Sequence, residues 1–182
     1  MTGLTQVRLS GLGGQGIVMA GLLLGEAGVI EGRNVSGSNF YGAQARGSEC
    51  RSEVIFSENP IDFPQVILAD VLVSMSQGTY DRDSGEVRED SGLILYDKGL
   101  VTPLEGLNVT QVGFPATDHS VKQLKNQQMA NIVLLGALIE ITKLVTPGAL
   151  RKAIGLHIQP RFRALNLKAL RLGTTLGRAV NG

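Results

Sequence analysis

Short apolar runs alternate with helical apolar patterns along much of the chain, and this alternation predicts strands interleaved with helices. The first run, Gln6–Ser10, predicts a buried strand, and the apolar pattern over Ile17–Ile30 predicts the helix that follows it. Arg51–Phe56 alternates polar and apolar residues, which is typical of a strand with one solvent-facing side. Further short strands are predicted at Asn34–Asn39, Val71–Met75, Leu93–Tyr96 and Asn108–Val112.

The second half of the chain is predicted to be mainly helical, after a helical or turn segment that begins at Gln77–Tyr80. Thr117–Thr142 is predicted to be one long helix, introduced by Pro115 and capped by Thr117 or Asp118. A shorter helix is expected to begin at Thr146-Pro147 and to end at Gly155. The last helix is predicted from apolar residues at helical spacing: Phe162, Leu165, Ala169, Leu172 and Leu176.

Three glycines, Gly21, Gly25 and Gly28, lie near one face of the first predicted helix. Each costs about 1 kcal/mol of helix propensity relative to alanine, so a close approach of this helix to the sheet is the expected compensation. With 182 residues, of which 43% are hydrophobic and 18% charged, the chain suits a single domain spanning residues 1–182. We predict an α/β fold with three α/β/α layers around a mostly parallel or mixed central sheet, Rossmann-like but distinct from an NAD-binding fold.

The candidate binding site is a glycine-rich turn between the first predicted strand and helix. Backbone N–H groups at the start of a helix can converge on an anion, and glycine leaves no side chain in their way. The glycine spacing also matches a dinucleotide-binding fingerprint, but the predicted second strand, Asn34–Asn39, contains no carboxylate for a ribose, and Glu31 precedes it. A phosphate-binding turn and a purely structural turn both remain open. The candidate residues are Gly11, Gly13, Gly14, Gln15, Gly16 and Ile17.

A second candidate segment, Tyr41–Ser48, lies between two predicted strands and contains Arg46 among small residues. A guanidinium in this setting suits a bidentate contact with phosphate or carboxylate. The alternative is an ordinary solvated arginine in a surface loop.

Composition excludes several classes of function. The absence of tryptophan and an aromatic content of 4% disfavour a nucleic-acid-binding surface. A single cysteine, Cys50, excludes an internal disulfide framework and cannot by itself hold an iron–sulfur cluster or a zinc ion. The longest apolar run, Ile132–Ile139, is too short to span a membrane, and no signal sequence opens the chain. A cytoplasmic protein is expected.

Charge is distributed unevenly. Residues 1–140 hold 9 lysines and arginines against 16 aspartates and glutamates, whereas residues 141–182 hold 8 lysines and arginines and no acid. The basic end could be a solvated helical face, or it could contact an anionic ligand or an acidic partner. His119 and His157 are expected to be structural rather than catalytic.

These motifs occur in an ordered series that resembles the gamma subunit of the 2-oxoacid:ferredoxin oxidoreductases over nearly the whole chain. The loop is most similar to that of the 2-oxoglutarate enzymes, in which a Tyr-Gly-Pro-Glu-Ala-Arg-Gly-Gly segment is typical, although Ala43, Gln44 and Ser48 depart from it. A pyruvate or branched-chain oxoacid enzyme and the beta subunit of indolepyruvate oxidoreductase are the alternatives. The series comprises Gly11 to Ile17, Tyr41-Gly42, Arg46-Gly47, Pro64, Asp70-Val71-Leu72, Pro115 to Asp118, Asn131, Gly136 and Asn166 to Gly173.

The resemblance implies a division of labour within a complex that converts a 2-oxoacid to an acyl-coenzyme A and reduces ferredoxin. Thiamine diphosphate, Mg²⁺ and the iron–sulfur clusters would lie on partner subunits, and this chain would be inactive alone. Its glycine turn would bind the pyrophosphate of coenzyme A, with Arg46 or the basic C-terminal segment at the 3′-phosphate. A homodimer is expected when the chain is isolated. The alternatives of another class are a structural adaptor with an empty turn and a freestanding nucleotide-binding protein.

Overall fold

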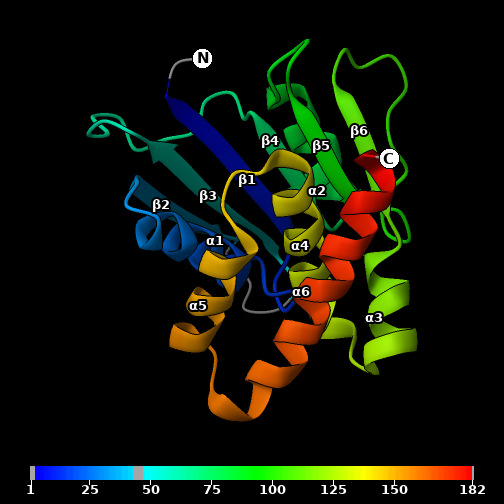
Figure 1. Ribbon diagram of the computed structural model, residues 1–182. Coiled ribbons are helices and arrows are strands. Elements are labelled where there is room, and N and C mark those ends of the chain that lie inside the picture. Colours follow the sequence, from blue (N-terminus) through cyan, green and yellow to red (C-terminus); the bar gives the residue numbers. More distant parts are fainter. Residues whose placement is uncertain (1–2, 43–46, 182) are drawn as a thin grey trace.

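A mixed six-stranded sheet forms the centre of the protein, with strand order β2-β3-β1-β4-β5-β6 (Figure 1). The computed structural model describes residues 3–42 and 47–181. Strands β1, β4, β5 and β6 run parallel, whereas β3 is antiparallel to both β1 and β2. The predicted α/β class is therefore confirmed, with a mixed sheet. The strands are β1 (Leu4–Leu12), β2 (Asn34–Tyr41), β3 (Glu49–Ser57), β4 (Val71–Ser74), β5 (Leu93–Asp97) and β6 (Thr110–Phe114).

Helices lie on both faces of this sheet (Figure 1). On one face, α1 (Ile17–Ile30) and α4 (Ala130–Thr142) pack against the strands, with α5 (Pro147–His157) on α1 and α6 (Pro160–Asn181) on α4. The largest apolar core lies on this side. The other face carries α2 and a smaller apolar cluster around Tyr80. The remaining elements are α2 (Gln77–Asp83), η1 (Ser84–Glu86), α3 (Ala116–Leu124) and η2 (Gln127–Met129).

Strand β3 separates β1 from β2, and this order distinguishes the fold from an NAD-binding one. In a dinucleotide-binding unit the first two strands are neighbours, and an acid at the end of the second reaches the ribose. Here β2 is an edge strand, beyond β3, and it contains no acid. The sheet thus agrees with the prediction against a nicotinamide site.

The helical glycines permit the close approach that the sequence predicts for α1. A Cβ at Gly21 would lie 2.0 Å from Ser52 Oγ, and one at Gly28 would lie 2.5 Å from the Phe56 ring. Glycine also permits a close approach between α4 and α6, where a Cβ at Gly173 would lie 2.0 Å from the Val133 carbonyl oxygen. These two helices run parallel. Gly173 lies near Gly136, and the helical turns that follow these two glycines are also in contact with each other.

The prediction of one long helix over Thr117–Thr142 is wrong. The chain leaves the helix at Lys125, which adopts a left-handed conformation with φ 54°, and resumes after Asn126, whose Oδ1 accepts the Gln128 N–H at 2.9 Å. The predicted cap is also wrong: Asp97, at the end of β5, accepts both the backbone N–H and the hydroxyl of Thr117, at 2.8 and 2.6 Å. The break brings the start of α4 beside the glycine turn.

The predicted stop at Gly155 is wrong as well, because α5 continues to His157. The helix ends where Ile158 turns extended, shortly before Pro160 begins α6. Strand β6 begins at Thr110 rather than at the predicted Asn108. Within the described ranges, no helix has the length and apolar character needed to cross a membrane.

Candidate functional site

The glycine turn lies at the carboxyl edge of the parallel strands. It follows β1 at Leu12 and leads directly into α1 at Ile17. The hairpin formed by β2 and β3 opens at the same edge, because Leu12 pairs with Glu49 and Tyr41 pairs with Cys50. In open α/β sheets this edge is where ligands bind.

Two positions in the turn require glycine. Gly14 has φ 97° and Gly16 has φ 74°, in the region that side chains disfavour. A Cβ at Gly16 would lie 2.3 Å from Asn131 Nδ2, so this position is also closed by packing. A Cβ at Gly14 would meet no described atom within 4 Å, so this side of the turn is open.

Gln15 shapes the turn from within. Its Oε1 accepts the Leu12 N–H at 2.6 Å, and its Nε2 donates to the Met75 carbonyl, at the end of β4, at 2.9 Å. Gly11 lies beneath it, since a Cβ there would be 2.5 Å from Gln15 Oε1. The predicted candidates Gly11 and Gln15 therefore stabilise the turn itself, and the Gln15 carboxamide does so with one donated and one accepted hydrogen bond.

The backbone donors of the turn fall into two groups. The Gly13 N–H donates to Ser48 O at 2.8 Å and the Gln15 N–H to Leu12 O at 3.1 Å. The N–H groups of Gly14, Gly16 and Ile17 bond no acceptor in the part of the chain that the structure describes. These three remain available to an anion at the start of α1.

Asn131 ties the start of α4 to the start of α1. Its side chain is 7% exposed, and its Nδ2 donates to the Gly16 carbonyl at 2.9 Å while its Oδ1 accepts the Ile132 N–H at 2.8 Å. Sequence reasoning assigned no structural role to Asn131. The signal was Asn126, a helix-capping residue inside the apolar pattern, which would have placed a helix start beside Asn131.

Arg46 lies outside the described residues. The residues that follow it lie beside the glycine turn, because the Ser48 carbonyl oxygen accepts the Gly13 N–H. Gly47 adopts a left-handed conformation, with φ 74°. The turn and the end of the hairpin connection are thus joined by a backbone hydrogen bond.

Two cavities flank the turn and share Gly14 and Gln128 in their walls. The helix-end cavity, of about 380 Å³, lies at the starts of α1, α4 and α6. The strand-end cavity, of about 310 Å³, lies toward the end of β4 and the start of α3. The helix-end cavity is lined by Gly14, Gly16, Met19, Asn126, Gln128, Met129, Asn131, Ile132, His157, Ile158, Gln159, Phe162 and Asn166. The strand-end cavity is lined by Gly13, Gly14, Gln15, Met75, Thr117, Gln127, Gln128 and Ala130.

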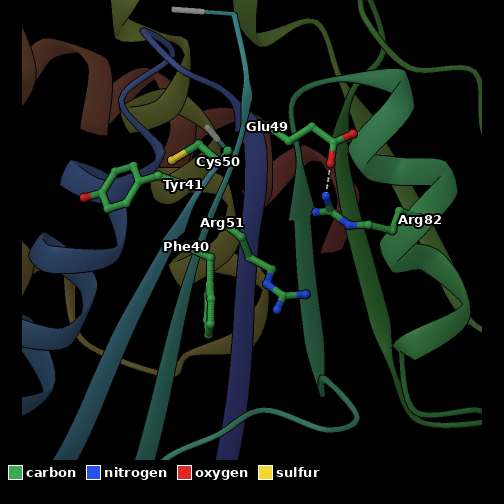
Figure 2. Close-up of a pocket in the computed structure, with 7 residues that line it drawn as sticks. Phe40, Tyr41, Glu49, Cys50, Arg51 and Arg82 are labelled. Carbon is green, nitrogen blue, oxygen red and sulfur yellow. Dashed lines mark hydrogen bonds and ion pairs between the residues drawn. The ribbon is translucent and has the colours of Figure 1, made fainter. Parts of the chain in front are cut away.

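A third cavity, of about 320 Å³, lies at the end of the hairpin and contains two arginines (Figure 2). The Arg51 guanidinium lies 4.6 Å from the centre of the Phe40 ring. Arg82 pairs with Glu49 and, through two hydrogen bonds of 2.7 and 2.8 Å, with the fully buried Asp83. The bond to Asp83 raises the pKa of Arg82 further. Carboxylates already balance the charge of Arg82.

Cys50 has no features of a reactive thiol. The residue is 7% exposed and belongs to the main apolar core, and burial raises its pKa. Its sulfur points away from the two guanidinium groups (Figure 2). A nucleophilic cysteine requires the opposite environment, in which the thiolate is stabilised.

Both histidines have side-chain partners. His157 Nε2 lies 2.9 Å from Glu26 Oε2, and His119 Nδ1 lies 2.6 Å from Gln123 Nε2. Across residues 3–42 and 47–181, no three metal-binding side chains are grouped together. What the site offers is a set of backbone donors at the start of α1, with Gly14 bordering both cavities, an arrangement suited to binding an elongated anionic molecule.

Comparisons with known proteins agree with this architecture. A family model described as pyruvate ferredoxin/flavodoxin oxidoreductase matches residues 6–176. The 2-oxoglutarate synthase subunit KorC of Methanocaldococcus jannaschii is 40% identical over 151 residues, which are 82% of this chain and 81% of that protein.

Two solved structures are similar in fold. The gamma subunit of a keto/oxoacid ferredoxin oxidoreductase from Geobacter sulfurreducens has a TM-score of 0.84 at 32% identity, covering 96% of this chain and 99% of that one. A 2-oxoglutarate:ferredoxin oxidoreductase from Magnetococcus marinus, solved with 2-oxoglutarate, coenzyme A and succinyl-CoA, has a TM-score of 0.88 at 21% identity, covering 98% of this chain and 32% of that one. The chain therefore belongs to the pyruvate ferredoxin/flavodoxin oxidoreductase family, and the resemblance of its sequence to the gamma subunits is confirmed.

Proposed function

We propose that this chain is the gamma subunit of a 2-oxoglutarate:ferredoxin oxidoreductase and that its glycine turn holds the pyrophosphate of coenzyme A. The choice of 2-oxoglutarate is supported by the sequence similarity to a 2-oxoglutarate synthase subunit, which extends over most of both chains. It is also supported by the loop sequence around Tyr41-Gly42 and Arg46-Gly47.

The single observation that carries the coenzyme A assignment is the set of donors at the turn. The N–H groups of Gly14, Gly16 and Ile17 have no acceptor among the described residues, at the positive end of a 14-residue helix. Gly14 is open on its Cβ side and borders both cavities, so a molecule with a central pyrophosphate can extend in two directions from it.

In this proposal the chain positions coenzyme A and the partner subunits supply the chemistry. Thiamine diphosphate with Mg²⁺ and the iron–sulfur clusters belong to those partners, which pass electrons to ferredoxin. The chain alone is inactive, and it forms a homodimer when isolated. The cytoplasm is its proposed location.

Gly14→Asp tests the donor assignment, because it places a carboxylate at the open side of the proposed anion site. Its effect should be a rise of roughly tenfold or more in the concentration of coenzyme A that half-saturates the complex. Gly14→Asn is the matched control, since it imposes similar backbone strain without charge. Gly32→Asp is a second control, because Gly32 also has a positive φ, of 79°, and no described atom near its Cβ.

Three outcomes separate the possibilities in assays of the assembled complex with several 2-oxoacids. Both parts of the proposal are supported if Gly14→Asp raises the half-saturating concentration of coenzyme A, the two control variants do not, and the complex prefers 2-oxoglutarate as its substrate. Equal coenzyme A saturation for Gly14→Asp and the parent would instead indicate an adaptor whose turn binds no nucleotide. Preference for pyruvate or a branched-chain oxoacid would overturn the choice of substrate alone.

A further inference from the structure

The outward side of α6 carries positive charge that no acid in the same helix balances. Lys168, Arg171 and Arg178 follow one another at helical spacing, which places them on one face of α6. Lys168 and Arg171 are exposed, and the Arg178 side chain is 70% exposed. The sequence of α6 contains no aspartate or glutamate. We call Lys168, Arg171 and Arg178 the α6 basic face.

The opposite side of α6 is buried against α4, so the α6 basic face points away from the rest of the protein (Figure 1). Ala169 and Leu170 are buried, and a Cβ at Gly177 would lie 2.9 Å from the Glu140 Cβ. No residue of the α6 basic face lines either cavity beside the glycine turn. This face is therefore separate from the proposed coenzyme A site.

The charge of the α6 basic face is not balanced within the described parts of the chain. Arg178 and Lys143 share one carboxylate, that of Glu140. Neither Lys168 nor Arg171 has a carboxylate partner within residues 3–42 and 47–181. They lie about one helical turn apart, where like charges destabilise a helix by about 0.2–0.5 kcal/mol. Only Arg178 is near the end of α6, where the helix dipole favours a cation. Helix stability thus does not explain this pattern.

The shape of the α6 basic face limits the kind of partner that fits it. At a rise of about 1.5 Å per residue, Lys168 and Arg178 are about 15 Å apart, which is too far for one small anion. No aromatic residue lies between them on which a nucleic-acid base could stack. A membrane is also disfavoured, because the apolar side of α6 is already buried. An extended surface with several carboxylates fits best.

We propose that the α6 basic face docks on an acidic surface of another protein subunit of the oxidoreductase complex. Arginine can hold a carboxylate with two parallel hydrogen bonds, and the lysine adds a compact charge beside it. Thr175, which is exposed between the cations, is small enough to let the partner approach closely. This assignment rests on the proposed function as a subunit of such a complex, and it specifies which surface a neighbouring subunit covers.

Sedimentation velocity of the assembled complex over a dilution series tests this contact. Lys168→Glu combined with Arg171→Glu should raise the dissociation constant of the chain from the complex at least about tenfold, because attractive contacts become repulsive. Raising the salt concentration from about 0.05 M to about 0.5 M should weaken the parent complex more than the variant complex. Lys168→Gln combined with Arg171→Gln should have a smaller effect in the same direction.

Lys98→Glu combined with Lys122→Glu is the matched control. Both lysines are exposed and lie outside α6, and the double substitution changes the net charge by the same amount. It should leave the dissociation constant unchanged. An equal loss with this control, or no loss with the α6 variants, overturns the docking contact while the parent complex still assembles.

Two further outcomes identify other errors. If the α6 variants weaken only the self-association of the isolated chain, the face binds a second copy and the proposed partner is overturned. If the parent chain does not assemble with the subunits of a 2-oxoacid oxidoreductase, the proposed function itself is overturned, and the docking contact with it.

Discussion

The carboxamide of Gln15 connects three parts of the chain at one point. It accepts from Leu12 at the end of β1, donates to Met75 at the end of β4, and precedes the first turn of α1. A carboxamide can do this because it carries a donor and an acceptor on one rigid plane. The shape of the glycine turn therefore depends on a side chain as well as on its glycines.

Gln15→Glu should destabilise the fold. The substitution places an oxygen where Nε2 now donates to the Met75 carbonyl, so a hydrogen bond becomes a repulsive contact. We expect the free energy of unfolding to fall by about 1–3 kcal/mol, measured by denaturant titration. Gln65→Glu is the control, because Gln65 is exposed, and it should change stability by less than about 0.5 kcal/mol. An equal effect of the two substitutions would contradict this role of Gln15.

The residue pattern predicted where the turn lies. It did not predict which partner each hydrogen-bonding group of the turn has. The glycine spacing between a strand and a helix was sufficient to locate the turn. The partners of its donors are distant in sequence, since Gly13 bonds Ser48 and Gly16 accepts from Asn131. Such contacts depend on the order of strands in the sheet, which local patterns do not specify.

At the scale of elements, glycine acts in opposite ways at two helical positions. Gly173 lies at the contact of α6 with α4, where a Cβ would be 2.0 Å from the Val133 carbonyl oxygen. Gly155 lies inside α5 with no described atom near its Cβ position. The first glycine is needed for packing, whereas the second only weakens its helix.

We therefore expect opposite effects from two equivalent substitutions. Gly173→Ala should lower the free energy of unfolding by roughly 2 kcal/mol or more, because backbone atoms must move apart. Gly155→Ala should raise it by about 0.5–1 kcal/mol, because alanine is the better helix former. Thermal or denaturant unfolding of the two variants measures both, and changes of the same sign would show that this account of the two glycines is wrong.

An ion-pair cluster also joins α4 to α6. Glu140 Oε1 lies 2.7 Å from Lys143 Nζ and 3.3 Å from Arg178 Nε. Hydrogen bonding to Lys143, and then to Arg178, lowers the pKa of Glu140 below its ordinary value of 4.5. Its contribution to stability is present above the pKa of the unfolded state and is lost as the pH falls through the lower folded pKa.

Removing this carboxylate should flatten the acid side of the stability profile. Glu140→Gln should lose less stability than the parent when unfolding is measured at about pH 7 and again at about pH 3.5. Glu105→Gln, at an exposed position, should keep the slope of the parent. An unchanged slope for Glu140→Gln would show that Glu140 does not contribute to acid sensitivity.

Element types were more predictable than element ends. Strands and helices follow the periodicity of apolar residues, except at the break between α3 and α4, where the apolar pattern continues but the helix does not. The break itself depends on Lys125 and Asn126, whose conformations override that pattern. Asp97 caps α3 from a neighbouring strand, so no local sequence signal could identify it.

At the scale of the whole molecule, an apolar patch lies at the amino end of β1, opposite the glycine turn. Ile67 is 68% exposed, Phe63 57% and Leu4 41%, and the three line one shallow cavity. Exposed apolar groups that gather in this way mark contact surfaces between subunits. The patch is distinct from the proposed coenzyme A site.

In the homodimer that we propose for the isolated chain, Ile67→Asp should weaken the contact, because burial of an isoleucine there is worth about 1.5–3 kcal/mol. Sedimentation velocity over a concentration series should show a dissociation constant at least about tenfold higher than that of the parent. Val121→Asp, at an exposed apolar position of α3, is the control and should have no effect. Equal dimer stability in all three proteins would exclude this patch from the contact.

The antiparallel insertion of β3 determines where the hairpin connection lies. Because β3 returns between β1 and β2, the hairpin connection lies at the same edge of the sheet as the glycine turn, and Ser48 at its end accepts the Gly13 N–H. We expect that replacing the connection with that of a relative would leave the pairings of β2 with β3 and of β3 with β1 unchanged. A chimaera that carries another relative's connection should keep the parent fold and reveal how much of oxoacid preference travels with those few residues.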